Sequence, residues 1–149
     1  MPRFLEDFEI GETWVSRPYE MTQEEIISYA LQNDPQPMHT DPEKAAAGRF
    51  GTVIASGWQI AALSMRLFIE GGGHGDTPVV GLGIDELRWR KPVRPGDVLK
   101  VTREVISTER SKSRPEFGVI RSRVTVANQN GEAVMTLVSL GQVPARAAK

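Results

Sequence analysis

The sequence predicts an α+β fold in which an antiparallel sheet of five or six strands curls around one buried helix. Residues 56–70 are apolar on almost every side of a helical wheel, with no charged residue before Arg66, which is typical of a helix covered on most sides. The second half of the chain alternates apolar and polar residues between turn signals, which is typical of antiparallel strands. One long apolar helix beside such a sheet requires the sheet to wrap around it.

Segments with period-two alternation follow the long helix. In the first of them the alternation slips by one position at Asp85-Glu86, which predicts a β-bulge. Pro95-Gly96-Asp97 separates the first two segments, and Asn130-Gly131 indicates a tight hairpin between the last two. Together with an earlier segment, the predicted strands are 13–19, 80–89, 98–106, 117–127 and 133–143.

Two shorter helices are predicted ahead of the apolar one. Thr22, with Glu25 three residues later, forms a capping box that starts a helix ending by Asn33. Asp41-Pro42 starts another, with Asp as the N-cap and Pro in the first turn, and Gly48 closes it.

The link between these two helices holds the candidate site. Asp34 and His39 are five residues apart, with prolines at 35 and 37 that fix φ and disfavour helix in the residue before each. We expect an extended, rigid segment on which a carboxylate and an imidazole converge on one water molecule, with His39 taking its proton. The residues alone leave a second interpretation open, in which the prolines form ordinary turns and the pair is only a structural hydrogen bond.

Composition limits the function classes. Eighteen basic and nineteen acidic residues give a net charge of −1, which does not favour a general nucleic-acid or membrane-surface binder. The absence of cysteine excludes disulfides and thiol catalysis, and with an acidic N-terminus that shows no export signal it favours a cytoplasmic location. The longest uncharged run is too short for a membrane span. No metal site is expected, because only two histidines are present and the acids near His39 lack ligand spacing.

The chain is expected to form a single domain over 1–149, with a disordered tail at 145–149. The glycine-rich stretch 71–76 predicts a flexible loop, in which His74 is expected to be exposed to solvent.

Four motifs together resemble the MaoC-like acyl dehydratases, also described as (R)-specific enoyl-CoA hydratases, which have the hot-dog fold. The motifs are the opening at 4–12, the Asp-Pro-Gln-Pro-Met-His-Thr-Asp segment at 34–41, IASGW at 54–58 and RKPVRPGD at 90–97. The Asp-to-His spacing, matched with the Ser-Gly start of the apolar helix, is specific, whereas any one motif alone is weak. The resemblance covers most of the chain and implies a single hot-dog domain.

What the resemblance implies is a lyase of fatty acid metabolism that adds water to C3 of a trans-2-enoyl thioester, or removes it. Asp34 and His39 would hold the water, with His39 as the base and Asp34 returning a proton to C2. The backbone N–H of Gly57 would stabilise the enolate-like thioester oxygen at the helix N-terminus. CoA or acyl carrier protein would be the handle of the substrate, with no other cofactor. Substrate-binding candidates are Gln36, Ser56, Trp58, Arg88, Arg90 and Lys91.

Three positions depart from the family pattern. Gln36 stands where Asn is usual, and Ser56 where His is often found. Ala62 stands where established hydratases tend to carry a Ser that supports the dyad, a loss that Ser64 or a water molecule could offset. Two other classes therefore stay open, a hot-dog thioesterase and a non-catalytic acyl-binding subunit of a heteromeric dehydratase.

Purely structural roles for the residues at the start of the apolar helix also stay open. Ser56 can be an ordinary N-cap, Gly57 a packing residue and Trp58 part of the core.

One curled sheet leaves edge strands unpaired and one face of the helix poorly covered. We therefore expect a homodimer with a continuous sheet and an acyl tunnel at the interface, as the resemblance also implies.

Overall fold

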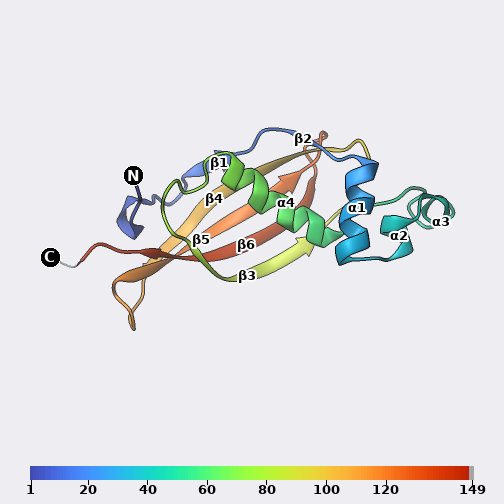
Figure 1. Ribbon diagram of the computed structural model, residues 1–149. Coiled ribbons are helices and arrows are strands. Elements are labelled where there is room, and N and C mark those ends of the chain that lie inside the picture. The colour runs from blue at the N-terminus through green and yellow to red at the C-terminus, as the bar shows by residue number, and fades with distance from the viewer. Residues whose placement is uncertain (148–149) are drawn as a thin grey trace.

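The computed structural model describes residues 1–147 and shows a six-stranded antiparallel sheet that curves around one long helix, with three short helices at one end (Figure 1). The elements are η1 Leu5–Asp7, β1 Thr13–Val15, β2 Tyr19–Glu20, α1 Gln23–Asn33, α2 Pro37–Thr40, α3 Pro42–Ala46, α4 Gly57–Glu70, β3 Val80–Trp89, β4 Val98–Arg110, β5 Phe117–Ala127 and β6 Ala133–Pro144. The predicted fold class is confirmed. None of the helices within 1–147 is long and apolar enough to cross a membrane.

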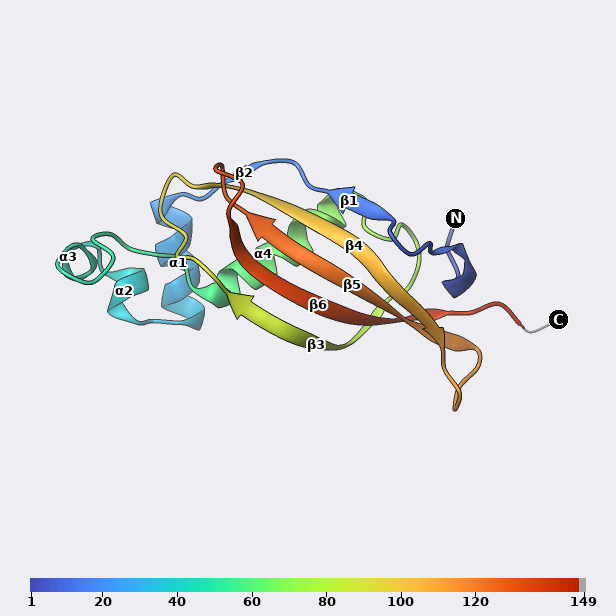
Figure 2. The same cartoon turned by 180° about the vertical axis from the view of Figure 1, so that it is seen from behind.

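The strands follow the order β1-β4-β5-β6-β3, and β2 also pairs with β4, as the view from behind shows (Figure 2). The predicted strand 13–19 is divided into β1 and β2 around Pro18, which has no backbone N–H to donate. The bulge predicted in the next strand is confirmed, because the register against β6 shifts between Asp85 and Arg88 and Glu86 has a φ of 54°. The hairpin at Asn130-Gly131 is confirmed as well.

Helix α4 lies on the concave face of the sheet and buries one of its sides against it. Its inward residues Ile60, Leu63 and Leu67 join the main core with side chains from β4, β5 and β6. Its opposite side is open, since Trp58 and Ile69 are 57% and 60% exposed. The prediction that this helix is covered on most sides is therefore wrong for a single copy of the chain.

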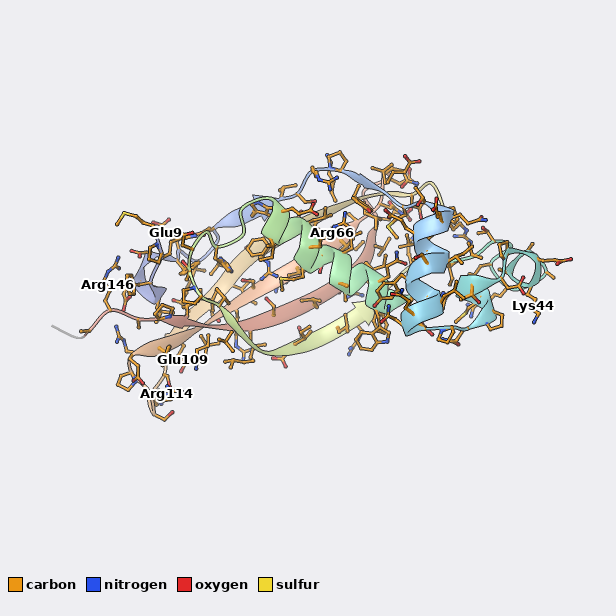
Figure 3. All side chains as sticks on the ribbon, in the orientation of Figure 1. Glu9, Lys44, Arg66, Glu109, Arg114 and Arg146 are labelled. Carbon is orange, nitrogen blue, oxygen red and sulfur yellow. The ribbon has the colours of Figure 1, made fainter. Side chains whose placement is uncertain are left out.

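The edge strand β3 continues this open surface. Its side chains Val80, Leu82, Ile84 and Trp89 are all exposed, and so are Met65 and Val79. We call this surface the β3–α4 face and define it by Trp58, Met65, Ile69, Val79, Val80, Leu82, Ile84 and Trp89. Among the charged side chains labelled in Figure 3, Lys44 in α3 and Arg114 in the turn between β4 and β5 are exposed. Trp58 and Trp89 are in contact and join the exposed apolar side chains of α4 to those of β3, and a large exposed apolar surface marks an interaction site.

The short helices α1 and α2 agree only in part with the prediction. Thr22 caps α1 by accepting a hydrogen bond from the Glu25 N–H at 3.2 Å, whereas the Glu25 carboxylate accepts from the Tyr19 hydroxyl instead of closing a box. The expectation that 34–39 is extended throughout is wrong, because Pro37 opens the single helical turn α2. A proline is well suited to the first position of a helix, since its φ is already helical and its missing N–H would have no partner there.

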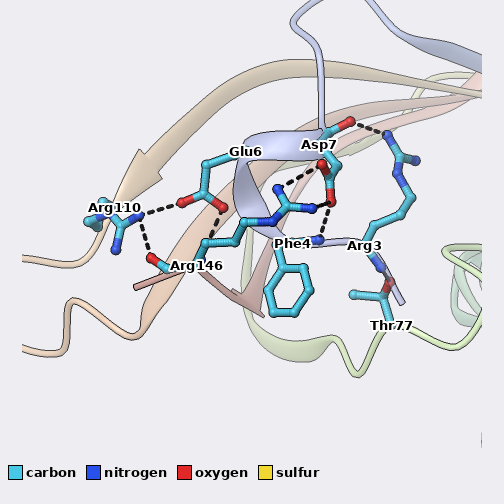
Figure 4. A network of polar contacts seen from close by, with 7 residues as sticks. All are labelled: Arg3, Phe4, Glu6, Asp7, Thr77, Arg110 and Arg146. Atoms are coloured by element: carbon cyan, nitrogen blue, oxygen red, sulfur yellow. Dashed lines mark hydrogen bonds and ion pairs between the residues drawn. The ribbon is translucent and has the colours of Figure 1, made fainter. Parts of the chain in front are cut away.

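The two ends of the chain are tied together by ion pairs around η1. Arg146 forms two 2.8 Å hydrogen bonds with the Asp7 carboxylate, and Glu6 pairs with Arg110 and accepts from the Arg146 N–H (Figure 4). Ala145 is buried and donates its N–H to the Glu116 carbonyl. The predicted disorder is therefore wrong for positions 145 and 146, while 148 and 149 lie outside the described residues.

His74 is also not a solvent-exposed loop residue. Its ring packs edge-on against Phe8 and Phe68, with ring centroids 5.3 and 4.8 Å apart. This packing attaches the glycine-rich loop to α4 and to the residue that follows η1. Phe8 follows η1 and Phe68 lies in α4, so the residues around position 74 in the sequence do not reveal these contacts.

Candidate active site

The structure brings Asp34 and His39 together at the junction of α1 and α2. Asp34 ends α1, and the single turn of α2 places His39 so that its Nε2 lies 3.3 Å from Asp34 Oδ2. The His39 ring is buried, and the Asp34 side chain is largely covered. A short helix thus achieves the convergence that we expected from an extended segment.

The other nitrogen of His39 decides how the ring can act. Nδ1 donates a 2.6 Å hydrogen bond to the Ile54 carbonyl, which can only accept, so Nδ1 carries the proton. In the neutral ring Nε2 is then the basic nitrogen, and it faces the Asp34 carboxylate. Two acceptors that face each other in this way can share one proton donor such as water.

The Asp34 carboxylate is held at both oxygens. Gln36 Nε2 donates to Oδ1 at 2.7 Å, and Ser56 Oγ donates to Oδ2 at 2.8 Å. The bond from Gln36, followed by the bond from Ser56, lowers the pKa of Asp34 below its usual value against the opposing effect of burial. Asp34 is therefore held as an anion, which bonds donated to a carboxylate favour.

The start of α4 completes the site. Within residues 1–147 no acceptor faces the backbone N–H of Gly57, which leaves this donor available at the positive end of the helix. Trp89 Nε1 donates to the Gly57 carbonyl at 3.0 Å, and a Cβ built on Gly57 would lie 2.3 Å from the Trp89 ring. Trp58 packs edge-on against Trp89, with centroids 5.0 Å apart. Position 57 therefore requires glycine because the Trp89 ring fills the space that a side chain would occupy.

A cavity of about 360 Å³ lies beside these groups. His39, Gly57 and Trp89 contribute to its wall, together with the apolar side chains of Met38, Phe50, Ile54, Ala55, Ile60, Val93 and Val134. Asp34 contacts His39 but does not itself line the cavity. A larger hollow of about 820 Å³ between α1 and α4 contains none of the predicted site residues. The acid/base pair places the candidate active site at the smaller cavity.

The predicted basic residues divide into two groups. Arg90 and Lys91 line the cavity, where Lys91 pairs with Glu132 and Arg90 Nε donates to the Thr136 hydroxyl at 2.9 Å. Arg88 does not line it. Arg49 lines it too, and the sequence reasoning missed this residue. The available signal was its position in an Arg-Phe pair between the His39 segment and the Ser-Gly helix start.

No hydroxyl from position 62 or 64 bonds to Asp34 or His39. Ala62 faces the larger hollow, and Ser64 Oγ donates to the Ala61 carbonyl at 2.7 Å. The suggestion that Ser64 compensates for Ala62 is therefore wrong. Ser56 bonds Asp34 instead, and its side chain caps no backbone N–H of α4, so the ordinary N-cap interpretation is wrong as well.

Comparison with known proteins identifies the family and agrees with the observed fold. Residues 7–128 match the model of the MaoC like domain. A crystal structure of the MaoC-like dehydratase from Rhodospirillum rubrum superimposes with a TM-score of 0.86 at 35% identity, covering 98% of this chain and 99% of that one.

Two sequence relatives show how far the likeness in sequence extends. The uncharacterized protein YdeM of Bacillus subtilis is 36% identical over 125 residues, which is 84% of this chain and 87% of the relative. The 3-hydroxyacyl-thioester dehydratase Z of Mycobacterium tuberculosis is 36% identical over 98 residues, 64% of this chain and 62% of that protein. With its sheet curved around α4 and its family match over most of its length, the chain belongs to the MaoC-like dehydratase family and has the hot-dog fold.

Proposed function

We propose that the protein is an enoyl thioester hydratase that converts a trans-2-enoyl thioester into the (R)-3-hydroxyacyl thioester and catalyses the reverse dehydration. The observation that carries the proposal is the 3.3 Å approach of His39 Nε2 and Asp34 Oδ2, with Nδ1 of the same ring bonded to Ile54. The relative named as a 3-hydroxyacyl-thioester dehydratase supports the reaction class. The (R) configuration follows the resemblance to the family.

In the hydration direction, a water molecule bound beside the two groups loses one proton to His39 Nε2 as its oxygen bonds to C3. The electrons of the C2–C3 double bond move toward the thioester carbonyl, whose oxygen becomes enolate-like. The backbone N–H of Gly57 stabilises that oxygen at the N-terminus of α4. The proton on His39 passes to Asp34 Oδ2, 3.3 Å away, and then to C2, which must lie at the side of the cavity next to Asp34. The atoms of water thus end on C3 and C2.

The low pKa of Asp34 suits its part in this sequence. A carboxyl group whose anion is stabilised by two donated hydrogen bonds gives up its proton more readily than an unassisted one, which favours transfer of the proton to C2. His39 takes the first proton, because its basic nitrogen is the one that faces the pair.

The CoA or phosphopantetheine group that carries the acyl chain is proposed to lie near Arg49 and Arg90. Both line the cavity, and within residues 1–147 neither has a carboxylate within ion-pair distance. Arginine presents several donors that suit the phosphates of CoA or of a phosphopantetheine arm on acyl carrier protein. Lys91 is a weaker candidate, since Glu132 already neutralises it.

The proposed assembly is a homodimer joined through the β3–α4 face. The edge of β3 opposite β6 has no neighbouring strand in the described sheet, and its side chains present an apolar surface. A second copy can pair with that edge in an antiparallel manner and cover the open side of α4.

The reaction is tested by incubating the purified protein with trans-2-enoyl-CoA substrates of short, medium and long chain and following loss of the enoyl thioester absorbance. We expect turnover without any added metal or cofactor. Unchanged absorbance across all substrates, with an active hydratase run in parallel, would disprove the proposal. Release of free CoA thiol would point to a thioesterase, and acyl-CoA binding without turnover to a non-catalytic subunit.

A further inference from the structure

We propose that Ser56 is a positioning residue that holds the Asp34 carboxylate in line with His39. This inference rests on the proposed function, since it assigns a role within the same site. Ser56 does not act on the substrate here. It acts through Asp34, and its hydroxyl takes the supporting role for which Ala62 has no group.

The contact is direct and shielded from water. Ser56 is fully buried, at 0% exposure, and its Oγ donates to Asp34 Oδ2 at 2.8 Å. The same oxygen lies 3.3 Å from His39 Nε2, so the hydroxyl bonds the oxygen that takes part in proton transfer. The other oxygen is bonded by Gln36, and two bonds to different oxygens fix the orientation of the carboxylate.

The position of Ser56 in the chain makes this role unusual. A serine directly before a helix is ordinarily an N-cap, with its hydroxyl bonded to a backbone N–H of the first turn. Ser56 forms no such bond to α4 and reaches 22 residues back along the chain to Asp34. The orientation of this hydroxyl thus serves the carboxylate rather than the helix.

Ser56 belongs to a short segment that organises the whole site. The Ile54 carbonyl fixes the proton on His39 Nδ1, Ser56 fixes Asp34, and Gly57 presents its N–H at the start of α4. Three residues within the stretch 54–57 therefore set the orientation of the base, the acid and the oxyanion donor relative to one another. Loss of the Ser56 hydroxyl removes the hydrogen bond to Asp34 but leaves the bond from His39 to Ile54 and the N–H of Gly57 in place.

The hydrogen bond also has a measurable electrostatic effect. Donation to the ionised carboxylate lowers the pKa of Asp34, so removing the hydroxyl must raise it. Hydration requires Asp34 in its unprotonated form. The acidic limb of the pH dependence of kcat/KM, which reports the Asp34–His39 pair as a unit, should therefore move to higher pH in Ser56→Ala.

The experiment compares Ser56→Ala with Ser64→Ala. Ser64 is a matched control, because it is a buried serine of α4 whose hydroxyl bonds only the Ala61 carbonyl. We expect Ser56→Ala to lower kcat by about 10- to 100-fold with little change in KM, the usual effect of losing an orienting partner. Ser64→Ala should keep the wild-type pH profile. In an Asp34→Asn background, Ser56→Ala should cause almost no further loss.

A second measurement does not depend on turnover. In protein labelled with ¹³C at aspartate carboxyl groups, NMR titration should show a higher pKa for Asp34 in Ser56→Ala than in wild type or Ser64→Ala. An active wild type with unchanged kcat and pH profile in Ser56→Ala overturns the inference while the proposed function stands. If wild type has no hydratase activity, the proposed function fails, and an unchanged Asp34 pKa in the variant overturns this inference separately.

Discussion

The indole of Trp89 occupies the space that a side chain on Gly57 would need, and its Nε1 donates a 3.0 Å hydrogen bond to the Gly57 carbonyl. Strand β3 is thereby connected to the first residue of α4, which carries the proposed oxyanion donor. The glycine and the tryptophan depend on each other, because only glycine leaves room for this approach.

Gly57→Ala should therefore destabilise the fold by about 1–3 kcal/mol, the usual range for overpacking, and should strongly reduce turnover by displacing Trp89 or the helix start. The measurement is urea unfolding, with kcat measured in parallel. In a Trp89→Ala background the added cost of Gly57→Ala should largely disappear. Equal costs in both backgrounds would show that the two residues are not coupled.

Asp34→Asn and His39→Asn should each lower kcat by at least about 10²-fold, because each removes one of the two groups that move the proton. Circular dichroism and the dimer mass should remain those of wild type. Arg88→Ala is a suitable control, since Arg88 does not line the cavity. Near wild-type turnover in either dyad variant would remove that residue from the mechanism.

His74 should make the stability of the protein depend on pH. Burial, reinforced by the positive charges of Arg103 and Arg3, lowers the pKa of His74 from 6.5 to about 4. Between these values the unfolded chain binds a proton that the folded chain does not, so this contribution to stability is lost as the pH falls from about 6.5 to about 4.

His74→Phe keeps a ring between Phe8 and Phe68 but cannot be protonated. Its free energy of unfolding should therefore fall less than that of wild type between pH 7 and pH 4.5, as measured by urea unfolding at each pH. Parallel curves for the two proteins would mean that His74 is not the group responsible.

The β3–α4 face should be the dimer interface. Leu82→Lys places a charge within it and should convert the dimer into a 16.5 kDa monomer, as measured by light scattering. Leu31→Lys is the matched control, because Leu31 is also a largely exposed leucine, at 62% against 51% for Leu82, and lies on α1 outside this face. A wild-type protein that is monomeric at micromolar concentration, or a Leu82→Lys dimer, contradicts the assignment.

The sequence by itself determined most elements of the fold, although not the helical turn α2 or the division of β1 from β2. Alternation with period two marked the strands, the slip at Asp85-Glu86 marked the bulge, and Thr22 marked the start of α1. These features depend on neighbours a few residues apart, which is why local pattern reveals them. The spacing of Asp34 and His39 likewise identified the pair, although the proline at 37 begins a helical turn instead of preventing one.

Only the tertiary structure decided how the site is held together. The bonds from His39 to Ile54, from Ser56 to Asp34 and from Trp89 to Gly57 join residues 15, 22 and 32 positions apart. The burial of His74 between Phe8 and Phe68 is a contact of the same kind. Periodicity reports which side of an element is apolar. It does not report which side chain from a distant element that side meets, because this depends on how the sheet curves around α4.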